Sequence, residues 1–143
     1  VQALDLVSRK LALDGGTVIE NFLERMTADI DAAAATSEVL GIAEAASVGV
    51  NTLRDVTAWL RQAEASSANA GATEYLRLFA LVALGWMWTR MAAAAAQEKT
   101  PRYREKIVLA HFFARRILPQ TRSLATAISE GSAAVMALPA EAF

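Results

Sequence analysis

An apolar stretch at residues 75–96 (YLRLFALVALGWMWTRMAAAAA) limits the possible folds of this 143-residue chain more than any other feature. Only Arg77, Thr89 and Arg90 interrupt it. A helix that is apolar on all sides is either a membrane span or the central helix of a bundle. A span needs about 20 largely uncharged residues, and residues 78–88 supply only about half of that length. We therefore expect a central helix with other helices packed around it.

Gly85 lies in the middle of this stretch and is unfavourable there, since glycine costs about 1 kcal/mol relative to alanine inside a helix. We expect the backbone of another helix to approach closely at this position. Trp86 and Trp88 lie about 200° apart around a helix axis, so they cannot share a face. One of them is expected in the core. For Trp88, a core position and a position at an interface both remain open.

The composition favours a single all-α domain. Only three prolines and seven glycines interrupt the chain, and no segment alternates between β-branched and polar residues. The absence of cysteine excludes disulfides and thiolate metal sites. A net charge of −1 argues against a dedicated nucleic-acid-binding protein.

Apolar residues at helical spacing predict six helical segments, four of them long. The segments are residues 2–12, 17–34, 37–65, 75–98, 101–118 and 120–131. The alanine- and serine-rich residues 63–72 are predicted to be a frayed helix end followed by an exposed loop. A short turn over residues 132–138 and an exposed tail complete the chain.

Several boundaries have a local signal. Asp14-Gly15-Gly16 predicts a tight reversal, because glycine tolerates positive φ. Thr17 and Glu20 have the spacing of a capping box. Thr36 or Ser37 is expected to cap the third segment. Thr100 is expected to cap the fifth segment, with Pro101 as its first residue. Pro119 predicts a kink or a break after the fifth segment.

Four long helices with short connections predict an antiparallel up-down four-helix bundle. The short N-terminal helix, held by an Asp5–Arg9 pair one turn apart, is expected to pack against this bundle.

Motifs that carry catalysis are missing from the sequence. It has no glycine-rich phosphate loop, no nucleophile elbow and no Glu-x-x-His pair of the kind found in di-iron bundles. The single histidine, His111, has no carboxylate three or four residues away, so a structural role is favoured over general-base or metal-ligand chemistry. Glu20 and Glu24 lie one turn apart but belong to a solvated face. The sequence therefore predicts no catalytic, cofactor-binding or metal-ligating residue.

Basic residues gather between positions 99 and 122, with Glu105 as the only acid among them. The cluster consists of Lys99, Arg102, Arg104, Lys106, Arg115, Arg116 and Arg122. It is either a solvated helical face or a docking surface for a protein or an anionic ligand. Nucleic acid is disfavoured because aromatic residues are not interleaved with the charges. The candidate interface residues are Trp88, Arg102, Arg104, Arg115 and Arg116.

Three stretches together resemble the acyl-CoA dehydrogenase family. Residues 1–11 (VQALDLVSRKL) are similar to the segment that directly follows the catalytic Tyr-Glu-Gly-Thr motif. Residues 74–88 (EYLRLFALVALGWMW), and residues 110–131 (AHFFARRILPQTRSLATAISEG) with 137–143 (ALPAEAF), resemble the extra C-terminal helical domain of the larger bacterial enzymes. Those enzymes include dehydrogenases that act on methylthio-propionyl-CoA.

The resemblance implies a parent enzyme whose reactive groups lie outside this sequence. In the family a glutamate removes the α-proton of the acyl-CoA, FAD accepts the β-hydride, and an electron-transfer flavoprotein then accepts the electrons. That glutamate and the FAD site would lie upstream of Val1, so no cofactor is expected here. Residues 1–14 would continue from the upstream catalytic domain, and residues 15–143 would form a helical accessory domain. We expect a cytoplasmic homo-oligomer of bacterial fatty acid metabolism that contacts neither nucleic acid nor membrane.

Three functions remain open at this point. The first is an accessory domain that braces the catalytic domain and extends the subunit interface; the start of the chain without Met, in mid-pattern, favours it. The second is an independent helical module that binds a partner through the basic cluster or Trp88. The third is a bundle that encloses a small apolar ligand, which would require a closed pocket with a few convergent polar groups.

Overall fold

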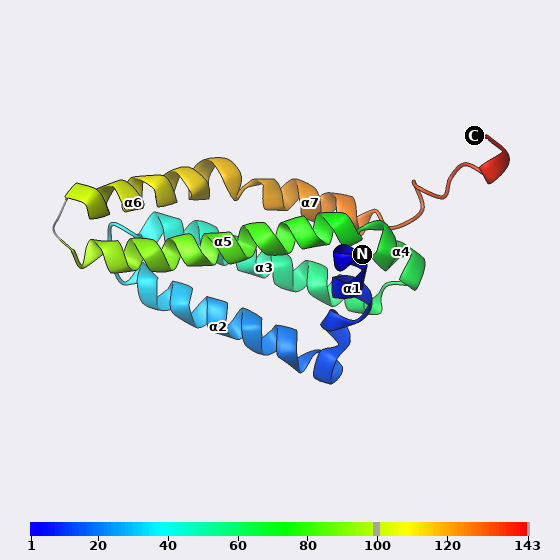
Figure 1. The fold of residues 1–143 in the computed structure, drawn as a ribbon, viewed down its shortest axis with the longest axis horizontal. Coiled ribbons are helices and arrows are strands. Elements are labelled where there is room, and N and C mark those ends of the chain that lie inside the picture. The colour runs from blue at the N-terminus through cyan, green and yellow to red at the C-terminus, as the bar shows by residue number, and fades with distance from the viewer. Residues whose placement is uncertain (99–100, 143) are drawn as a thin grey trace.

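A computed structural model describes residues 1–98 and 101–142, and within these ranges the protein is helical without any strand (Figure 1). The elements are α1 (Gln2–Ser8), η1 (Lys10–Gly16), α2 (Thr17–Ala34), α3 (Leu40–Gln62), α4 (Ala65–Ala70), α5 (Ala72–Ala96), α6 (Pro101–Phe112), η2 (Phe113–Ile117), α7 (Gln120–Ser129) and η3 (Ala140–Ala142). The predicted all-α class is confirmed.

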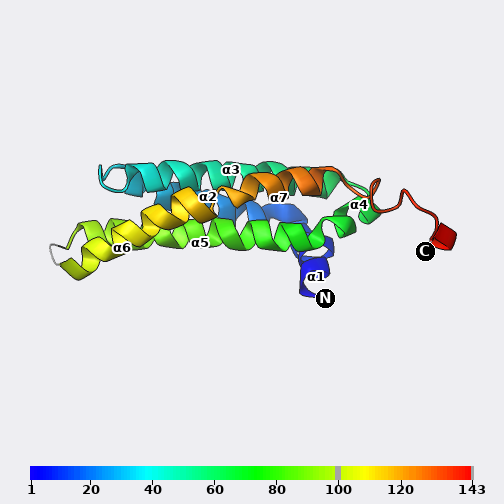
Figure 2. The same cartoon turned by 90° about the horizontal axis from the view of Figure 1, so that it is seen from above.

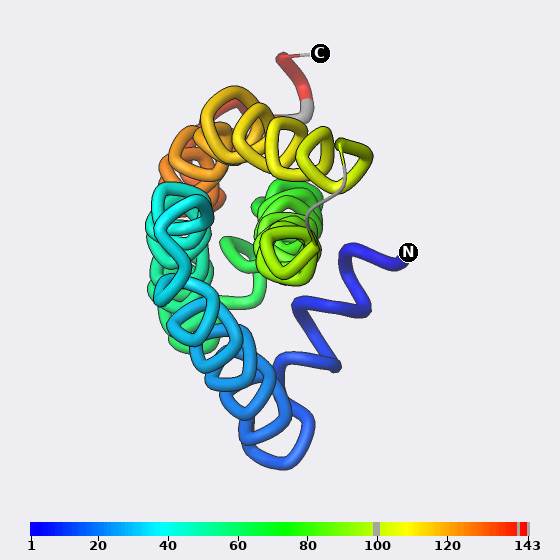
Figure 3. Tube along the Cα trace, turned by 90° about the vertical axis from the view of Figure 1, so that its left-hand side faces the viewer, coloured from blue at the N-terminus to red at the C-terminus, as the bar shows by residue number. Residues whose placement is uncertain are grey.

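Four antiparallel rods make up the bundle: α2, α3, α5, and a composite rod of α6, η2 and α7 (Figure 1). Each rod runs opposite to the one before it in the chain, so the predicted up-down order is confirmed. Seen from above, α7 continues from α6, and it packs against both α3 and α5 (Figure 2). Seen end-on, α2, α3, α7 and α6 form a curved layer with α5 inside the curve (Figure 3).

Helix α5 is the central helix, as its composition predicts. It packs against α1, α2, α3, α6 and α7, and it is the helix in the described part of the chain whose length and composition would suffice to cross a membrane. Tyr75, Leu78, Val82 and Ala92 on its inner face are fully buried. Its cover is incomplete, however, because Leu84 and neighbouring apolar residues on one side remain exposed.

Leu118 fills a close contact in the core. Its methyl groups lie between two glycines, Gly49 of α3 and Gly85 of α5. A Cβ built on Gly85 would lie 3.2 Å from Leu118 Cδ1, and one on Gly49 would lie 3.5 Å from the same atom. The expectation of a close helix backbone at Gly85 is wrong, since side chains of Leu118 and Phe113 occupy that space.

Pro119 breaks the composite rod, as predicted. The turn before it is a π turn, in which the Leu118 N–H donates to the Phe113 carbonyl at 2.9 Å instead of to Ala114. Such a turn carries one residue more than an α-turn and is found at sites of helix strain. Proline supplies no N–H and clashes with the carbonyl one turn back, so the chain is already off α-geometry when it reaches Pro119. Helix α7 then resumes at Gln120.

The N-terminal prediction is correct in outline and wrong in detail. The Asp5–Arg9 pair forms at 2.6 Å, but α1 ends at Ser8 and a 3₁₀ segment follows. The reversal at Asp14 and the two glycines after it is confirmed, with all three residues at positive φ. The predicted capping box does not form, because the N-cap is Gly16 and the Thr17 hydroxyl donates back to the Asp14 carbonyl at 2.8 Å.

Two further boundaries differ from the prediction. Helix α3 starts at Leu40 without a side-chain cap from Thr36 or Ser37. The predicted loop at residues 63–72 instead contains α4, whose Ala68 is buried in the core. Tertiary contact explains the difference, because Ser67 of α4 accepts a hydrogen bond from the backbone N–H of Ser132 beyond α7. The proposed cap at Thr100 lies outside the described residues.

Candidate functional site

The basic surface lies on the first half of the composite rod. Pro101 opens α6, as its fixed φ favours, and Arg102, Arg104, Arg115 and Arg116 of α6 and η2 are all exposed. None of the ion pairs in the described part of the chain involves these four arginines. Their charges are therefore directed to solvent and stay available to a partner.

The four arginines do not converge on one ligand. Arg102 and Arg116 are separated along the rod by about 20 Å at 1.5 Å per residue. Arg104 and Arg115 are separated by about 16 Å on the same reckoning. An anion the size of a phosphate could not reach both ends of this surface. The arrangement suits an extended partner surface better than a compact anionic ligand.

Trp88 of α5 packs against η2, the turn that also carries Arg115 and Arg116. It is partly buried, and its ring centroid is 6.3 Å from that of Phe113 at an interplanar angle of 33°. Trp86 points to the opposite side and is buried, and its Nε1 donates to Asp29 Oδ2 of α2 at 2.9 Å. Arg90 lies over the Trp86 ring at 5.2 Å. The expected division between the two tryptophans is confirmed, with Trp88 at the edge of the core.

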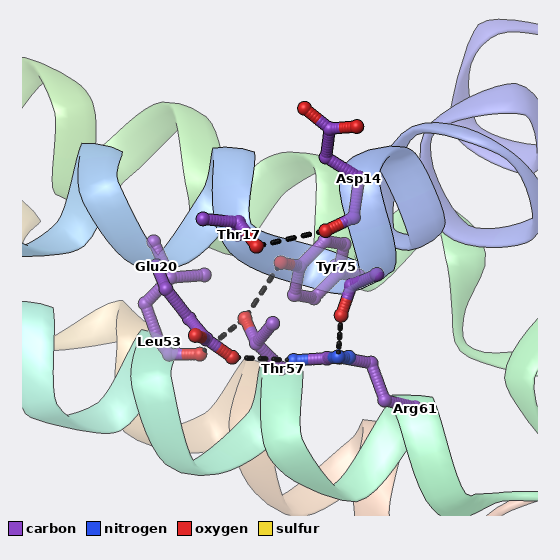
Figure 4. Close-up of polar contacts among 8 residues, drawn as sticks. Asp14, Thr17, Glu20, Leu53, Thr57, Arg61 and Tyr75 are labelled. Atoms are coloured by element: carbon purple, nitrogen blue, oxygen red, sulfur yellow. Dashed lines mark hydrogen bonds and ion pairs between the residues drawn. The ribbon is translucent and has the colours of Figure 1, made fainter.

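A hydrogen-bonded chain at Tyr75 fixes α5 to α3 (Figure 4). The Thr57 hydroxyl donates to the Leu53 carbonyl at 2.7 Å, so its oxygen accepts from the Tyr75 hydroxyl, also at 2.7 Å. Burial raises the pKa of Tyr75 to about 12. This pair was missed because Thr57 is polar, although its position four residues after Leu53 and three before Leu60 places it on the core face of α3.

A second polar contact fixes the reversal before α2 to α3 (Figure 4). The Arg61 guanidinium donates to Glu20 Oε1 at 2.7 Å and to the Gly15 carbonyl. It also lies so close to Gly16 that a Cβ there would overlap it. The turn therefore needs glycine at position 16 for its φ of +95°, and a Cβ there would also displace the Arg61 guanidinium. Arg61 and Glu20 are 41 positions apart, so no local signal in the sequence predicts their pairing.

The titratable groups do not form a catalytic cluster in the described residues. His111 is half-buried, and its Nδ1 is a buried atom without a hydrogen-bond partner there. Its Cε1 lies 4.0 Å from where a Cβ on Gly41 of α3 would be. Within the described ranges, no group of three or more His, Asp or Glu side chains is placed to hold a metal ion.

The hollows on the surface are open grooves. One of about 650 Å³ lies where α5 ends and α6 begins, and Glu38, Glu98 and Arg104 share its lining with alanines. Another of about 420 Å³ lies beside α1 and is lined in part by Arg61 and Asn69. A small-molecule site is usually an enclosed apolar pocket with a few convergent polar groups. These grooves do not have that form.

Comparison with known families gives one clear result. The family model described as acetyl-CoA dehydrogenase C-terminal like matches residues 22–139, which run from the first turns of α2 to the tail beyond α7. A search of curated proteins finds no match. The family match covers the four rods of the bundle and agrees with the resemblance drawn from the sequence. The chain therefore belongs to the C-terminal domain family of the acyl-CoA dehydrogenases.

Proposed function

We propose that this chain is the C-terminal accessory domain of an FAD-dependent acyl-CoA dehydrogenase. The parent oxidises an acyl-CoA to the 2-enoyl-CoA, and the glutamate base and the FAD site lie upstream of Val1. The family match over residues 22–139 carries this proposal. In the same proposal the parent is a cytoplasmic homo-oligomer that passes electrons to an electron-transfer flavoprotein and contacts neither nucleic acid nor membrane.

The role of the domain itself is structural. Its strongest polar contacts connect one helix to another: Arg61 reaches the turn before α2, Tyr75 reaches α3, and Trp86 reaches α2. These contacts make a stiff body that can brace the catalytic domain and extend the subunit interface. The residues with potential for catalysis are occupied in packing or directed to solvent.

The alternative is an independent interaction module. The four exposed arginines of α6 and η2, which take no part in the ion pairs of the described chain, favour it. The reading frame of the gene distinguishes the two proposals, because a stop codon followed by a start codon immediately before Val1 would exclude the accessory-domain role.

The bracing role is tested by deleting residues 15–143 from the parent polypeptide. We expect the truncated enzyme to melt at a lower temperature and to contain fewer subunits per oligomer, as calculated from its mass by light scattering. Bound flavin should still be detectable in the folded fraction, because the FAD site lies upstream of the deletion. An unchanged melting temperature together with an unchanged number of subunits would rule out bracing.

A further inference from the structure

One side of the central helix is apolar and uncovered. Leu84, Met87 and Met91 of α5 are 50%, 41% and 39% exposed, respectively. End-on, no rod covers α5 on the side between α6 and α1, away from the curved layer of the other rods (Figure 3). Apolar side chains exposed together on one helix face mark an interaction site more often than single exposed residues do.

The exposed residues on this side follow a regular spacing. They alternate at intervals of three and four positions along α5 and just past its end: Arg77, Ala80, Leu84, Met87, Met91, Ala94 and Glu98. A mean spacing of 3.5 residues defines the narrow seam by which two helices pair in a coiled coil. The wider stripe of a core-facing helix has a period of 3.6. We call these seven residues the α5 seam.

The order of residue types in the α5 seam is nearly the same in both directions. Leu84, Met87 and Met91 form its middle, an alanine lies on either side, and the ends carry opposite charges. The ends are Arg77 and Glu98, and neither takes part in an ion pair of the described chain. A seam with this symmetry is complementary to a reversed copy of itself.

The register of such a pair follows from helix geometry. With Met87 opposite Met87 of a second copy, Leu84 meets Met91 and Ala80 meets Ala94. Arg77 then faces Glu98 of the second copy, and the two-fold axis repeats the contact at the other end. A parallel pair would instead place Arg77 next to Arg77, which is repulsive.

We propose that a second copy of this chain docks on the α5 seam, forming an antiparallel α5–α5 pair with two-fold symmetry. Methionine suits the centre of such a contact because its flexible side chain adapts to a partner surface. The proposal goes beyond the accessory role and does not depend on it, because all the residues involved lie in this chain.

Analytical ultracentrifugation of the purified chain tests the proposal. We expect a concentration-dependent monomer–dimer equilibrium. Met87→Glu should weaken the dimer by about tenfold or more, because both copies lose a central apolar contact. Val48→Glu is the matched control, since Val48 is 48% exposed on α3 and lies outside the seam. Circular dichroism confirms that each variant is folded.

A charge-reversal cycle tests the direction of the pair. Arg77→Glu and Glu98→Arg should each weaken the dimer, and the double variant should recover it, because the opposite charges again meet across the interface. A wild-type chain that stays monomeric up to about 1 mM overturns the proposal. A dimer that is insensitive to Met87→Glu overturns the seam, and failure of the double variant to recover overturns the antiparallel arrangement.

Discussion

Replacing Gly85 with leucine tests the packing of the central helix most sharply. A Cβ at this position would lie 3.2 and 3.3 Å from the two methyl carbons of Leu118 and 3.8 Å from the Phe113 ring. Leucine adds three further carbons to the same space. Overpacking of this kind costs about 1–3 kcal/mol, and the better helix propensity returns about 1 kcal/mol. With three added carbons we expect an overpacking cost at the upper end of this range, about 3 kcal/mol. Subtracting the propensity gain of about 1 kcal/mol leaves a net loss of about 2 kcal/mol in the free energy of unfolding.

Two alanine variants provide the matched controls. Gly49→Ala faces the same Leu118 side chain, but its Cβ would be at an ordinary contact distance of 3.5 Å, so the propensity gain of up to about 1 kcal/mol should remain. Gly85→Ala should be close to neutral. Leu118 must move by a few tenths of an ångström, and the cost of this movement offsets the gain in helix propensity.

Chemical denaturation measures these differences directly, and in a thermal melt 1 kcal/mol corresponds to about 3–5 °C for a domain of this size. Two results would refute the reasoning about Leu118. One is a Gly85→Leu variant that is not destabilised at all, since even the lower bound for overpacking offsets the propensity gain. The other is a Gly49→Ala variant as destabilised as Gly85→Leu.

Three other predictions concern the polar contacts. Because folding raises the pKa of Tyr75 from about 10 to about 12, its stabilising effect is complete below pH 10 and is lost as the pH rises from about 10 to 12. About 3 kcal/mol should disappear over that interval, and Tyr75→Phe, but not the exposed Tyr103→Phe, should flatten this part of the pH–stability curve. Thr57→Val should cost about 1–3 kcal/mol, because it leaves the buried Tyr75 hydroxyl without an acceptor. Tyr75→Phe should cost only about 0.5–1.5 kcal/mol, because Thr57 stays bonded to Leu53. Equal losses of stability in urea denaturation would contradict the assignment of Tyr75 as the donor. Arg61→Met should increase hydrogen exchange in the turn before α2 with little change in the α6–α7 rod, and uniform exchange along the chain would argue against a local anchor.

The sequence allowed the rods to be predicted because their signals are local. Three signals act within a few turns. They are the apolar residues of α5, the helical spacing in α2 and α3, and the two prolines, of which Pro101 opens α6 and Pro119 precedes α7. Contacts between distant positions were not accessible in this way. Arg61 pairs with Glu20 across 41 positions, and the Ser67–Ser132 contact that accompanies α4 spans 65.

The candidate surface shows the same division. Arg102, Arg104, Arg115 and Arg116 were expected at the surface, and they lie there, but their role at an interface stays a prediction. The α5 seam could not be recognised beforehand, because α5 is apolar on every side and its sequence does not show which side the other rods leave open. The π turn before Pro119 was also missed, since proline predicts a break without specifying its geometry.

The central claim is that this bundle is an accessory domain and that the flavin chemistry of its parent takes place elsewhere. The most direct measurement is the visible absorbance of the purified, folded chain after incubation with FAD and gel filtration. We expect a cooperative thermal melt and no flavin absorbance in the protein peak. Stoichiometric flavin that stays with the chain would contradict the claim.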